Sequence, residues 1–199
     1  MPHEKLYFAT HNAHKVDEVR ALLCNAVDLA GIDTLSCHEE IPENGCTLQE
    51  NALQKALFVH THYGVDCFAD DTGLEVEALG GEPGIFSARY AGEPSDPAKN
   101  RRKLLEKLQG ESHRKARFRT VIALIEKGET HLFEGTVNGR ILETERGDGG
   151  FGYDNLFVPD GYNKTFAEMS AAEKNAISHR SRAMMKLNEF LSNHCKNEE

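Results

Sequence analysis

Apolar residues follow two spacings along the chain, and these spacings predict a succession of strands and helices. Four short apolar runs have the length of buried strands, and they are residues 5–9, 65–69, 74–76 and 156–158. After the first run, Val16, Val19 and Leu23 recur at the three- or four-residue interval of a helix. Because the strands alternate with helices, the pattern predicts an α/β fold.

Local capping motifs predict where further helices begin. Thr47 and Glu50 form one capping box, and Ser170 and Glu173 form another, in which each side chain binds a backbone amide at the other's position. Asp96 precedes a proline, which is typical of a helix start, and this helix is expected to run to about residue 108. These motifs add three helices to the predicted elements.

The last predicted helix carries a basic residue among its apolar positions. If this helix is continuous from Ala171 to about Leu191, Arg180 falls in the middle of its apolar stripe. A guanidinium in that position needs an acceptor, which either the protein or a ligand supplies. Alternatively, Ser178 caps a new helix, and Arg180 then lies in its first turn.

Residues 116 to 142 are rich in residues that favour strands, and two glycine-containing pairs punctuate them. Lys127-Gly128 predicts a hairpin, and Asn138-Gly139 is a second two-residue hairpin signal. This segment predicts an antiparallel meander beside the α/β core. Because the chain has no internal repeat and no low-complexity linker, we expect a single domain over residues 1–199.

Composition restricts the classes of partner. Hydrophobic residues (39%) and charged residues (28%) occur at the levels of a soluble globular protein, and no apolar run approaches the roughly 18 residues of a membrane span. The net charge of −9 disfavours nucleic-acid binding, which normally needs a basic surface. The five cysteines are odd in number and form no Cys-x-x-Cys pair, and the N-terminus has no signal-peptide core. We therefore expect a cytoplasmic protein whose phosphate ligand, if any, is small and metal-bound.

The segment from Thr10 to Lys15 follows a predicted strand and opens a predicted helix. A helix N-terminus attracts anions through its unpaired amides and its dipole. Asn12 is suited to cap the turn, and Lys15 adds a positive charge for a phosphate oxygen. An ordinary capped turn with an exposed lysine is the alternative interpretation.

Asp70 and Asp71 are adjacent carboxylates at the end of a predicted apolar strand. Like charges in such a place are costly unless a cation or hydrogen-bond donors offset them. A hard divalent ion meets that requirement, and Mg²⁺ commonly bridges carboxylates and substrate phosphates. A solvated surface turn is the alternative.

Five segments, in order along the chain, resemble motifs of the inosine triphosphate pyrophosphatase family, the Ham1-like purine triphosphate pyrophosphatases. The segments are Thr10–Lys15, Phe68–Leu74, Gly84–Tyr90, Phe151–Asp154 and Ser178–Arg180. The resemblance implies an elongated mixed sheet with flanking helices, two lobes and a central ligand cleft, in a protein that forms a homodimer. It also implies a Mg²⁺-dependent hydrolase acting on a phosphoric anhydride. Its substrates would be the non-canonical purine nucleoside triphosphates ITP, dITP and XTP, cleaved to the monophosphate and pyrophosphate so that they stay out of nucleic acid.

The resemblance also implies catalytic and metal-binding roles. Asp71 is expected to accept the proton of the attacking water and to bind Mg²⁺, with Asp70 in support. Glu43 stands where the family has a second acidic ligand, although Glu39 and Glu40 are close rivals.

The remaining residues implied by the resemblance bind the substrate. Contacts with the phosphates are assigned to Thr10, His11, Asn12, Ala13, His14, Lys15 and Lys55. Thr72 and Arg89 are further expected substrate-binding residues, although a structural loop with a tethering salt bridge is the alternative for the Arg89 segment. Contacts with the base and the sugar are assigned to Phe151, Gly152, Tyr153, Asp154, Lys174, His179 and Arg180. A donor such as Arg180 would favour bases with a 6-oxo group over adenine, whereas rejecting guanine needs something that disfavours its 2-amino group.

Two other functions are compatible with the sequence. One is a nucleotide-binding sensor without turnover, against which the paired acids and the two lysines argue. The other is a pyrophosphatase for a damaged pyrimidine or a methylated nucleotide. Pyrophosphate release separates the first from the enzyme, and competition between triphosphates separates the second.

Overall fold

The computed structural model describes residues 5–23, 27–37 and 39–197, and it has the predicted α/β fold. The chain divides into two compact units. Unit 1 comprises Met1–Asp71, Thr120–Gly135 and Arg180–Glu199, and unit 2 comprises Thr72–Arg119 and Thr136–His179. None of the helices in the described part of the chain has the length and apolar character that a membrane crossing requires.

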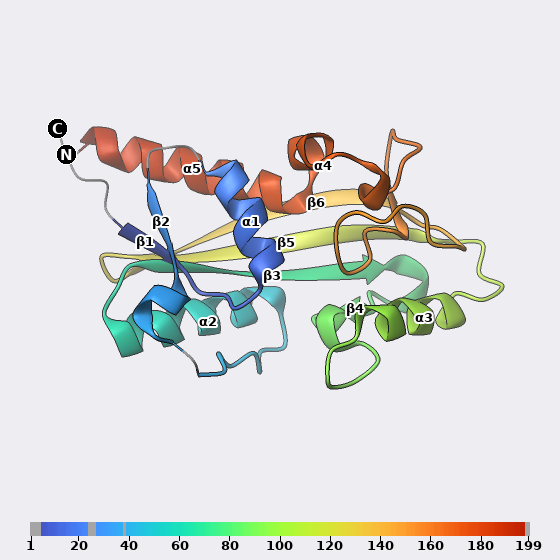
Figure 1. Ribbon diagram of the computed structural model, residues 1–199, viewed down its shortest axis with the longest axis horizontal. Helices are drawn as coiled ribbons and strands as arrows, with labels where there is room; N and C mark the ends of the chain where they lie inside the picture. Colours follow the sequence, from blue (N-terminus) through green and yellow to red (C-terminus); the bar gives the residue numbers. More distant parts are fainter. Residues whose placement is uncertain (1–4, 24–26, 38, 198–199) are drawn as a thin grey trace. The chain divides into compact units, whose positions relative to one another are not determined.

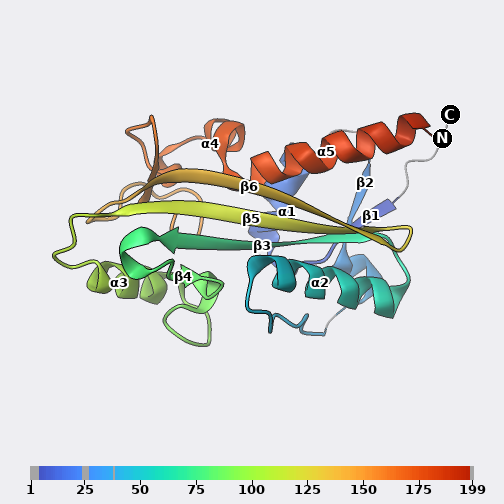
Figure 2. The same cartoon turned by 180° about the vertical axis from the view of Figure 1, so that it is seen from behind.

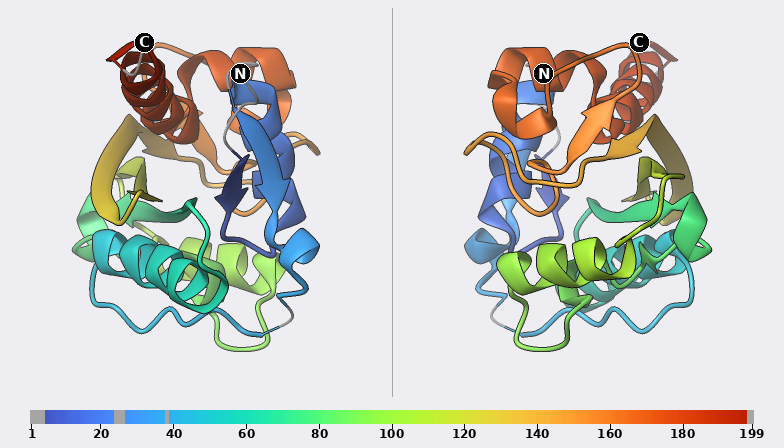
Figure 3. Two further views of the ribbon diagram at one scale, coloured as in Figure 1. Left: turned by 90° about the vertical axis from the view of Figure 1, so that its left-hand side faces the viewer. Right: turned by 90° about the vertical axis from the view of Figure 1, so that its right-hand side faces the viewer.

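Unit 1 is built on two short parallel strands and three helices. Strand β1 (Lys5–Phe8) pairs in parallel with β2 (Asp28–Gly31) and with β3 (Cys67–Val76). Helices α1 (Ala13–Leu22) and α5 (His179–Asn197) lie on one face of this sheet, and α2 (Leu48–Tyr63) lies on the other (Figures 1 and 3).

The core of unit 1 joins α1, α5 and the sheet. Phe8 and Phe68 stack with their ring centroids 4.6 Å apart. Val19 of α1 and Leu187 of α5 are buried in the same cluster. Burial of apolar side chains on this scale is the main stabilising contribution in a small domain. It fixes α1 and α5 against the face of β3 to which Asp70 belongs.

Unit 2 contains helices α3 (Pro97–Lys107) and α4 (Ala171–Ile177) and the short strands β4 (Pro83–Gly84) and β7 (Phe157–Pro159). Its separate core is rich in aromatic side chains, including Phe118, which meets Phe157 edge-on with the ring centroids 4.8 Å apart. The predicted strand at residues 156–158 is thereby confirmed within one residue.

Three long strands contribute residues to both units. They are β3, β5 (Lys115–Glu126) and β6 (Glu129–Ile141). The sheet order is β2-β1-β3-β5-β6-β7, and β4 pairs with β3 (Figure 2). Parallel pairing at β1 and antiparallel pairing at β4 and β7 make the sheet mixed, as expected.

One of the two predicted hairpin turns is present and the other is wrong. Lys127 and Gly128 join β5 to β6 with positive φ angles of 50° and 82°, as a tight hairpin requires. Asn138 and Gly139 instead lie inside β6. A Cβ atom at Gly139 would lie 2.2 Å from the carbonyl oxygen of Val158, so glycine here permits close approach of β7 rather than a turn.

The predicted helix starts are confirmed, with one change in the last helix. Asp96 caps α3 by accepting hydrogen bonds from two backbone amides, and Ser170 caps α4 in a complete capping box. Thr47 caps α2 by accepting from the amide of Glu50, but the Glu50 carboxylate accepts from the amide of Cys46, so the predicted reciprocal box at α2 is not formed. The last predicted helix does not continue to Leu191, however. Ser178 has extended backbone angles of −66° and 157°, which end α4, and α5 begins at His179. Of the two interpretations of this stretch, two separate helices is therefore the correct one.

Candidate active site

Asp70 and Asp71 lie inside β3 and not at the end of a strand as the sequence predicted. Successive residues of a strand point to opposite faces of a sheet. Accordingly, Asp70 contacts groups from α1 and α5, whereas Asp71 contacts groups from α2. The pleat of one strand therefore separates the two carboxylates, and each has its own set of partners.

Asp70 is paired with two cations. Lys15 Nζ donates to Asp70 Oδ1 at 2.8 Å, and Arg180 donates to Oδ2 from Nε at 3.2 Å and from Nη2 at 3.1 Å. The side chain of Asp70 is only 2% exposed. Burial alone would raise the pKa of Asp70, but Lys15 and Arg180 outweigh it and hold that pKa well below its usual range. Asp70 therefore stays ionised and orders both cations.

Arg180 extends the network of charges on this face to a second acid. Its Nη1 donates to Glu18 of α1, and its side chain is 1% exposed. The acceptor that the sequence required for this guanidinium is thus supplied by the protein. The predicted contact of Arg180 with a purine base stays a prediction. Glu18, which the sequence interpretation missed, stands three residues after Lys15 on the same helix, and that spacing was the available signal.

The segment from Thr10 to Lys15 forms the predicted capped helix start. Asn12 caps α1 by accepting a hydrogen bond from the amide of Lys15, and the Thr10 hydroxyl accepts one from the amide of Asn12. His11 Nε2 lies 3.1 Å from the carbonyl oxygen of Glu39. Ala13 and His14 are exposed in the first turn of α1. Exposed first-turn amides are suited to an anion, so this part of the predicted phosphate site has the expected local structure.

Asp71 faces a less compensated environment. Lys55 Nζ lies 3.7 Å from Asp71 Oδ1, and the same ammonium is bound by Glu43. Burial raises the pKa of Asp71, and Lys55 and Lys15 offset that effect only in part. Conversely, Asp71 and Glu43 outweigh the effect of burial on Lys55 and raise its pKa. Lys55 therefore holds its proton between two carboxylates.

The donor set around Asp71 fits a divalent cation. Lys55 supplies one positive charge against the two negative charges of Asp71 and Glu43, so these three groups have one negative charge in excess. Among the described residues, no group of three or more histidine, cysteine or acidic side chains is arranged to hold a metal. Mg²⁺ is commonly bound by one or two carboxylates together with substrate phosphates and water, so two carboxylates suffice. The position of Glu43 beside Lys55 also favours it over Glu39 and Glu40, which are exposed.

Asn51 is a second residue that the sequence interpretation missed. It is 1% exposed, and its Nδ2 donates to Asp71 Oδ2 at 3.1 Å. It stands four residues before Lys55, which places both side chains on one face of α2. That spacing, next to the predicted capping box, was the signal that could have identified it.

Apart from Arg180, which belongs to unit 1, the predicted base and sugar contacts lie in unit 2, and some of them form a buried cluster. Asp154 accepts hydrogen bonds from the Phe151 amide at 2.9 Å and from Lys174 Nζ at 2.7 Å. Lys174 Nζ also lies 4.9 Å from the centre of the Phe151 ring. A Cβ at Gly150 would lie 2.2 Å from Asp154 Oδ2, so the loop can approach this carboxylate only with glycine there. Asp154 therefore orders the loop that contains Phe151 and Gly152.

The other predicted residues of unit 2 have mixed surroundings. His179 stacks on Phe118, with the ring centroids 4.7 Å apart. The hydroxyl of Tyr153 is buried and donates to the carbonyl oxygen of Ser87 at 2.9 Å. Arg89 lies 5.6 Å from the ring of Phe86. Thr72 follows Asp71 in β3 and is partly exposed. Tyr153 thus has a structural contact of its own, and the substrate contacts assigned to these residues stay predictions.

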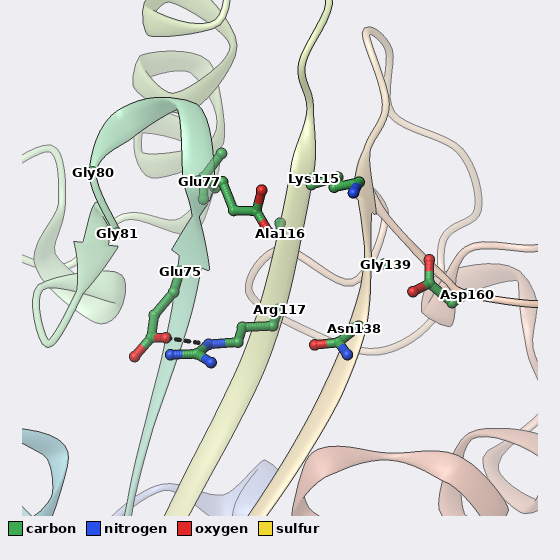
Figure 4. Close-up of a pocket in the computed structure, with 11 residues that line it drawn as sticks. Glu75, Glu77, Gly80, Gly81, Lys115, Ala116, Arg117, Asn138, Gly139 and Asp160 are labelled. Atoms are coloured by element: carbon green, nitrogen blue, oxygen red, sulfur yellow. Dashed lines mark hydrogen bonds and ion pairs between the residues drawn. The ribbon is translucent and has the colours of Figure 1, made fainter.

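Unit 2 also contains a cavity of about 490 Å³ beside strands β5 and β6 (Figure 4). Its wall has Glu75 and Glu77 on one side and Lys115 and Arg117 on the neighbouring strand, and Glu75 accepts a hydrogen bond from Arg117 at 2.5 Å. None of the residues that line it belongs to the predicted site. The cavity is therefore distinct from the candidate active site.

Comparison with known proteins identifies the family to which this chain belongs. The model of the Ham1 family matches residues 6–190. The chain belongs to the Ham1 family. A match of this extent includes all five segments on which the resemblance was based.

Individual Ham1-family relatives cover nearly the whole chain. A protein of Porphyromonas gingivalis named dITP/XTP pyrophosphatase is 56% identical over 94% of this chain and 97% of its own length. A protein of the same name from Christiangramia forsetii is 50% identical over 94% of this chain and 99% of its own. The solved structure of the Staphylococcus aureus Ham1 protein superposes with a TM-score of 0.88 at 38% identity, covering 96% of this chain and all of that one. The chain therefore has the Ham1 fold.

Proposed function

We propose that this protein hydrolyses non-canonical purine nucleoside triphosphates, namely dITP, XTP and ITP, to the nucleoside monophosphate and pyrophosphate. Two relatives named dITP/XTP pyrophosphatase, at 56% and 50% identity, support this substrate class. The structural observation that carries the proposal is the surroundings of Asp71, a largely buried carboxylate of raised pKa beside Lys55 and Glu43. In the reaction, water attacks a phosphorus atom of the anhydride that joins the α and β phosphates. That anhydride bond breaks, which releases the nucleoside monophosphate and pyrophosphate.

Asp71 is the proposed proton acceptor. A carboxylate whose pKa is raised by burial is a stronger base than an exposed one, which suits it to take a proton from water. Asn51 and Lys55 hold it in place, so little reorganisation is needed when the proton moves. A sensor without turnover would gain nothing from a carboxylate kept at this cost.

Asp71 and Glu43 are the proposed ligands of Mg²⁺. Bound there, the ion would supply positive charge that offsets the triphosphate and lowers the pKa of a bound water. Lys55 is placed to support the same phosphates. Lys15, held by Asp70, adds charge at the N-terminus of α1. Asp70 is thus proposed to act through Lys15 and Arg180 and not by proton transfer.

Three finer features are part of the proposal and rest on the family resemblance. The purine base is assigned to Phe151, Lys174, His179 and Arg180. The protein is proposed to act as a homodimer. It is proposed to work in the cytoplasm without binding nucleic acid, in keeping with its net charge of −9.

The test is pyrophosphate release from dITP, XTP, dGTP and dATP, each with Mg²⁺ and with a chelator. We expect Mg²⁺-dependent turnover of dITP and XTP, with kcat/KM at least about tenfold above that for dGTP and dATP. A tenfold ratio corresponds to a difference of about 1.4 kcal/mol in activation free energy. Equal rates with all four nucleotides would overturn the substrate class. Full rates in the presence of the chelator would overturn the proposed Mg²⁺ requirement. Nucleotide binding without turnover would favour the sensor function.

A further inference from the structure

Asn51 is a buried amide that uses both of its polar ends. Its Nδ2 donates to Asp71 Oδ2 at 3.1 Å, and its Oδ1 accepts from the backbone amide of Gly45 at 2.8 Å. These two partners fix the orientation of the amide, because a carboxylate needs a donor and an N–H group needs an acceptor. An aspartate in its place would set two carboxylates against each other.

Gly45 belongs to the loop that carries Glu43, and α2 holds this loop by three consecutive backbone amides. The amides of Asn44, Gly45 and Cys46 donate to side chains of α2, with distances of 2.8 Å, 2.8 Å and 2.6 Å. The three acceptors are Gln54, Asn51 and Glu50, respectively. The loop therefore lies at a fixed distance from the helix.

The approach of the loop to Asn51 is unusually close. A Cβ atom at Gly45 would lie 2.6 Å from the Cβ of Glu50 and 2.9 Å from Asn51 Oδ1. Real Cβ atoms do not come so near to such neighbours, so glycine is required at position 45. The hydrogen bond from Gly45 to Asn51 thus holds the segment with Glu43 close to the start of α2.

We infer that Asn51 is a positioning residue that sets the placement of the Glu43 and Asp71 carboxylates relative to each other. One end of its amide orients Asp71, and the other end holds the backbone two residues after Glu43. This inference rests on the proposed function, in which the two carboxylates bind Mg²⁺. Groups that orient metal ligands typically change metal affinity or activity by about 10- to 100-fold when they are removed.

The test uses Asn51→Ala, with Gln54→Ala as the matched control. Gln54 lies on the same helix and holds the same loop, through the amide of Asn44. Mn²⁺, a hard cation with the same preference for oxygen ligands, is titrated into each protein without nucleotide, and its free fraction is measured by electron paramagnetic resonance. The values of kcat and KM for dITP are measured at saturating Mg²⁺.

For Asn51→Ala we expect Mn²⁺ affinity and kcat to fall by about 10- to 100-fold each, with KM changed less than about threefold. Gln54→Ala should change neither by more than about threefold. Asn51→Ser, whose hydroxyl is too short to reach both partners, replaces Asn51→Ala if that variant does not fold. Circular dichroism and thermal melting establish that each variant is folded.

Two outcomes overturn the inference. One is a folded Asn51 variant with wild-type Mn²⁺ affinity and kcat. The other is Gln54→Ala with the same losses as Asn51→Ala, because the effect would then come from loop anchoring alone. A wild-type protein that hydrolyses no triphosphate, but binds Mn²⁺ more tightly than Asn51→Ala, would overturn the proposed function and support the positioning role. Wild-type protein that binds no Mn²⁺ would overturn both.

Discussion

Asp70 and Asp71 are neighbours in one strand, yet the two faces of β3 give them different electrostatic surroundings. On the Asp70 face, Lys15 and Arg180 balance the charges of Asp70 and Glu18. On the Asp71 face, Lys55 is shared between Asp71 and Glu43, which leaves one negative charge in excess. The four charges on the first face therefore cancel, whereas the three on the second do not.

This difference assigns different tasks to the two acids. A carboxylate with satisfied partners and a low pKa is poorly suited to accept a proton, and it serves to hold other side chains. A carboxylate with a raised pKa that shares a lysine with a second acid is suited to bind a metal ion or to act as a base. Substitutions at equivalent places on the two faces should therefore have opposite signatures in stability and activity.

The largest expected effect on activity is that of Asp71→Asn. The substitution keeps the volume of the side chain but removes both a base and a metal ligand, so kcat for dITP should fall by on the order of a thousandfold. The free energy of unfolding should change by less than about 1 kcal/mol, because the substitution relieves the excess of negative charge. Pyrophosphate release and urea unfolding measure the two quantities. A folded Asp71→Asn protein with more than a tenth of wild-type kcat would contradict the assignment.

On the other face, Asp70→Asn should mainly reduce stability. It leaves Lys15 and Arg180 without their common carboxylate, and removing one member of a buried ion pair costs about 3–5 kcal/mol. Urea unfolding with Asp71→Asn as the control gives the comparison directly. Equal losses of stability in the two variants would show that the two faces do not differ as described.

The sequence predicted the fold best where the signal is local. Capping residues such as Thr47, Asp96 and Ser170 act within a few residues, and each begins a helix in the structure. Strand β3 was predicted as two pieces because its Asp-Asp-Thr-Gly centre disfavours a strand. Partners distant in sequence, Lys15 and Lys55, compensate these acids and allow the strand to continue. The turn predicted at Asn138-Gly139 was wrong because the role of this pair also depends on a contact distant in sequence, the close approach of β7 to Gly139.

The candidate site shows a similar limit. Residues that belong to a motif, such as Lys15 and Asp71, could be identified from the sequence and the family resemblance. For Glu18 and Asn51 the only signal was their helical spacing from Lys15 and Lys55, and it did not reveal their roles, which depend on contacts with Arg180 and Asp71 across the fold. The sequence also could not tell whether Arg180 has a protein acceptor or a ligand acceptor, because that depends on which residues pack against α5.

Arg180→Lys should have an intermediate effect. A lysine keeps the charge but lacks the planar fork with which Arg180 reaches Asp70 and Glu18 together. We expect a loss of about 1.5–3 kcal/mol in the free energy of unfolding, the range for hydrogen bonds to charged groups. If Arg180 also contacts the purine base, the ratio of kcat/KM for dITP and dGTP changes as well. Wild-type stability in this variant would contradict a stabilising role for the network of charges on the Asp70 face.

The smallest expected effects concern the helix caps that serve the two faces. Asn12 caps α1, which carries Lys15, and Thr47 caps α2, which carries Asn51 and Lys55. Asn12→Ala and Thr47→Ala should each lower the free energy of unfolding by about 1 kcal/mol, whereas Asn12→Asp and Thr47→Ser, which keep a capping oxygen, should not.

If the faces differ as described, Thr47→Ala lowers kcat, because it loosens the start of the helix that orients Asp71. Asn12→Ala instead raises KM for dITP, because it disturbs the amides and the lysine proposed to bind phosphate. Identical changes in kcat and KM for the two cap variants would mean that the faces are not functionally distinct.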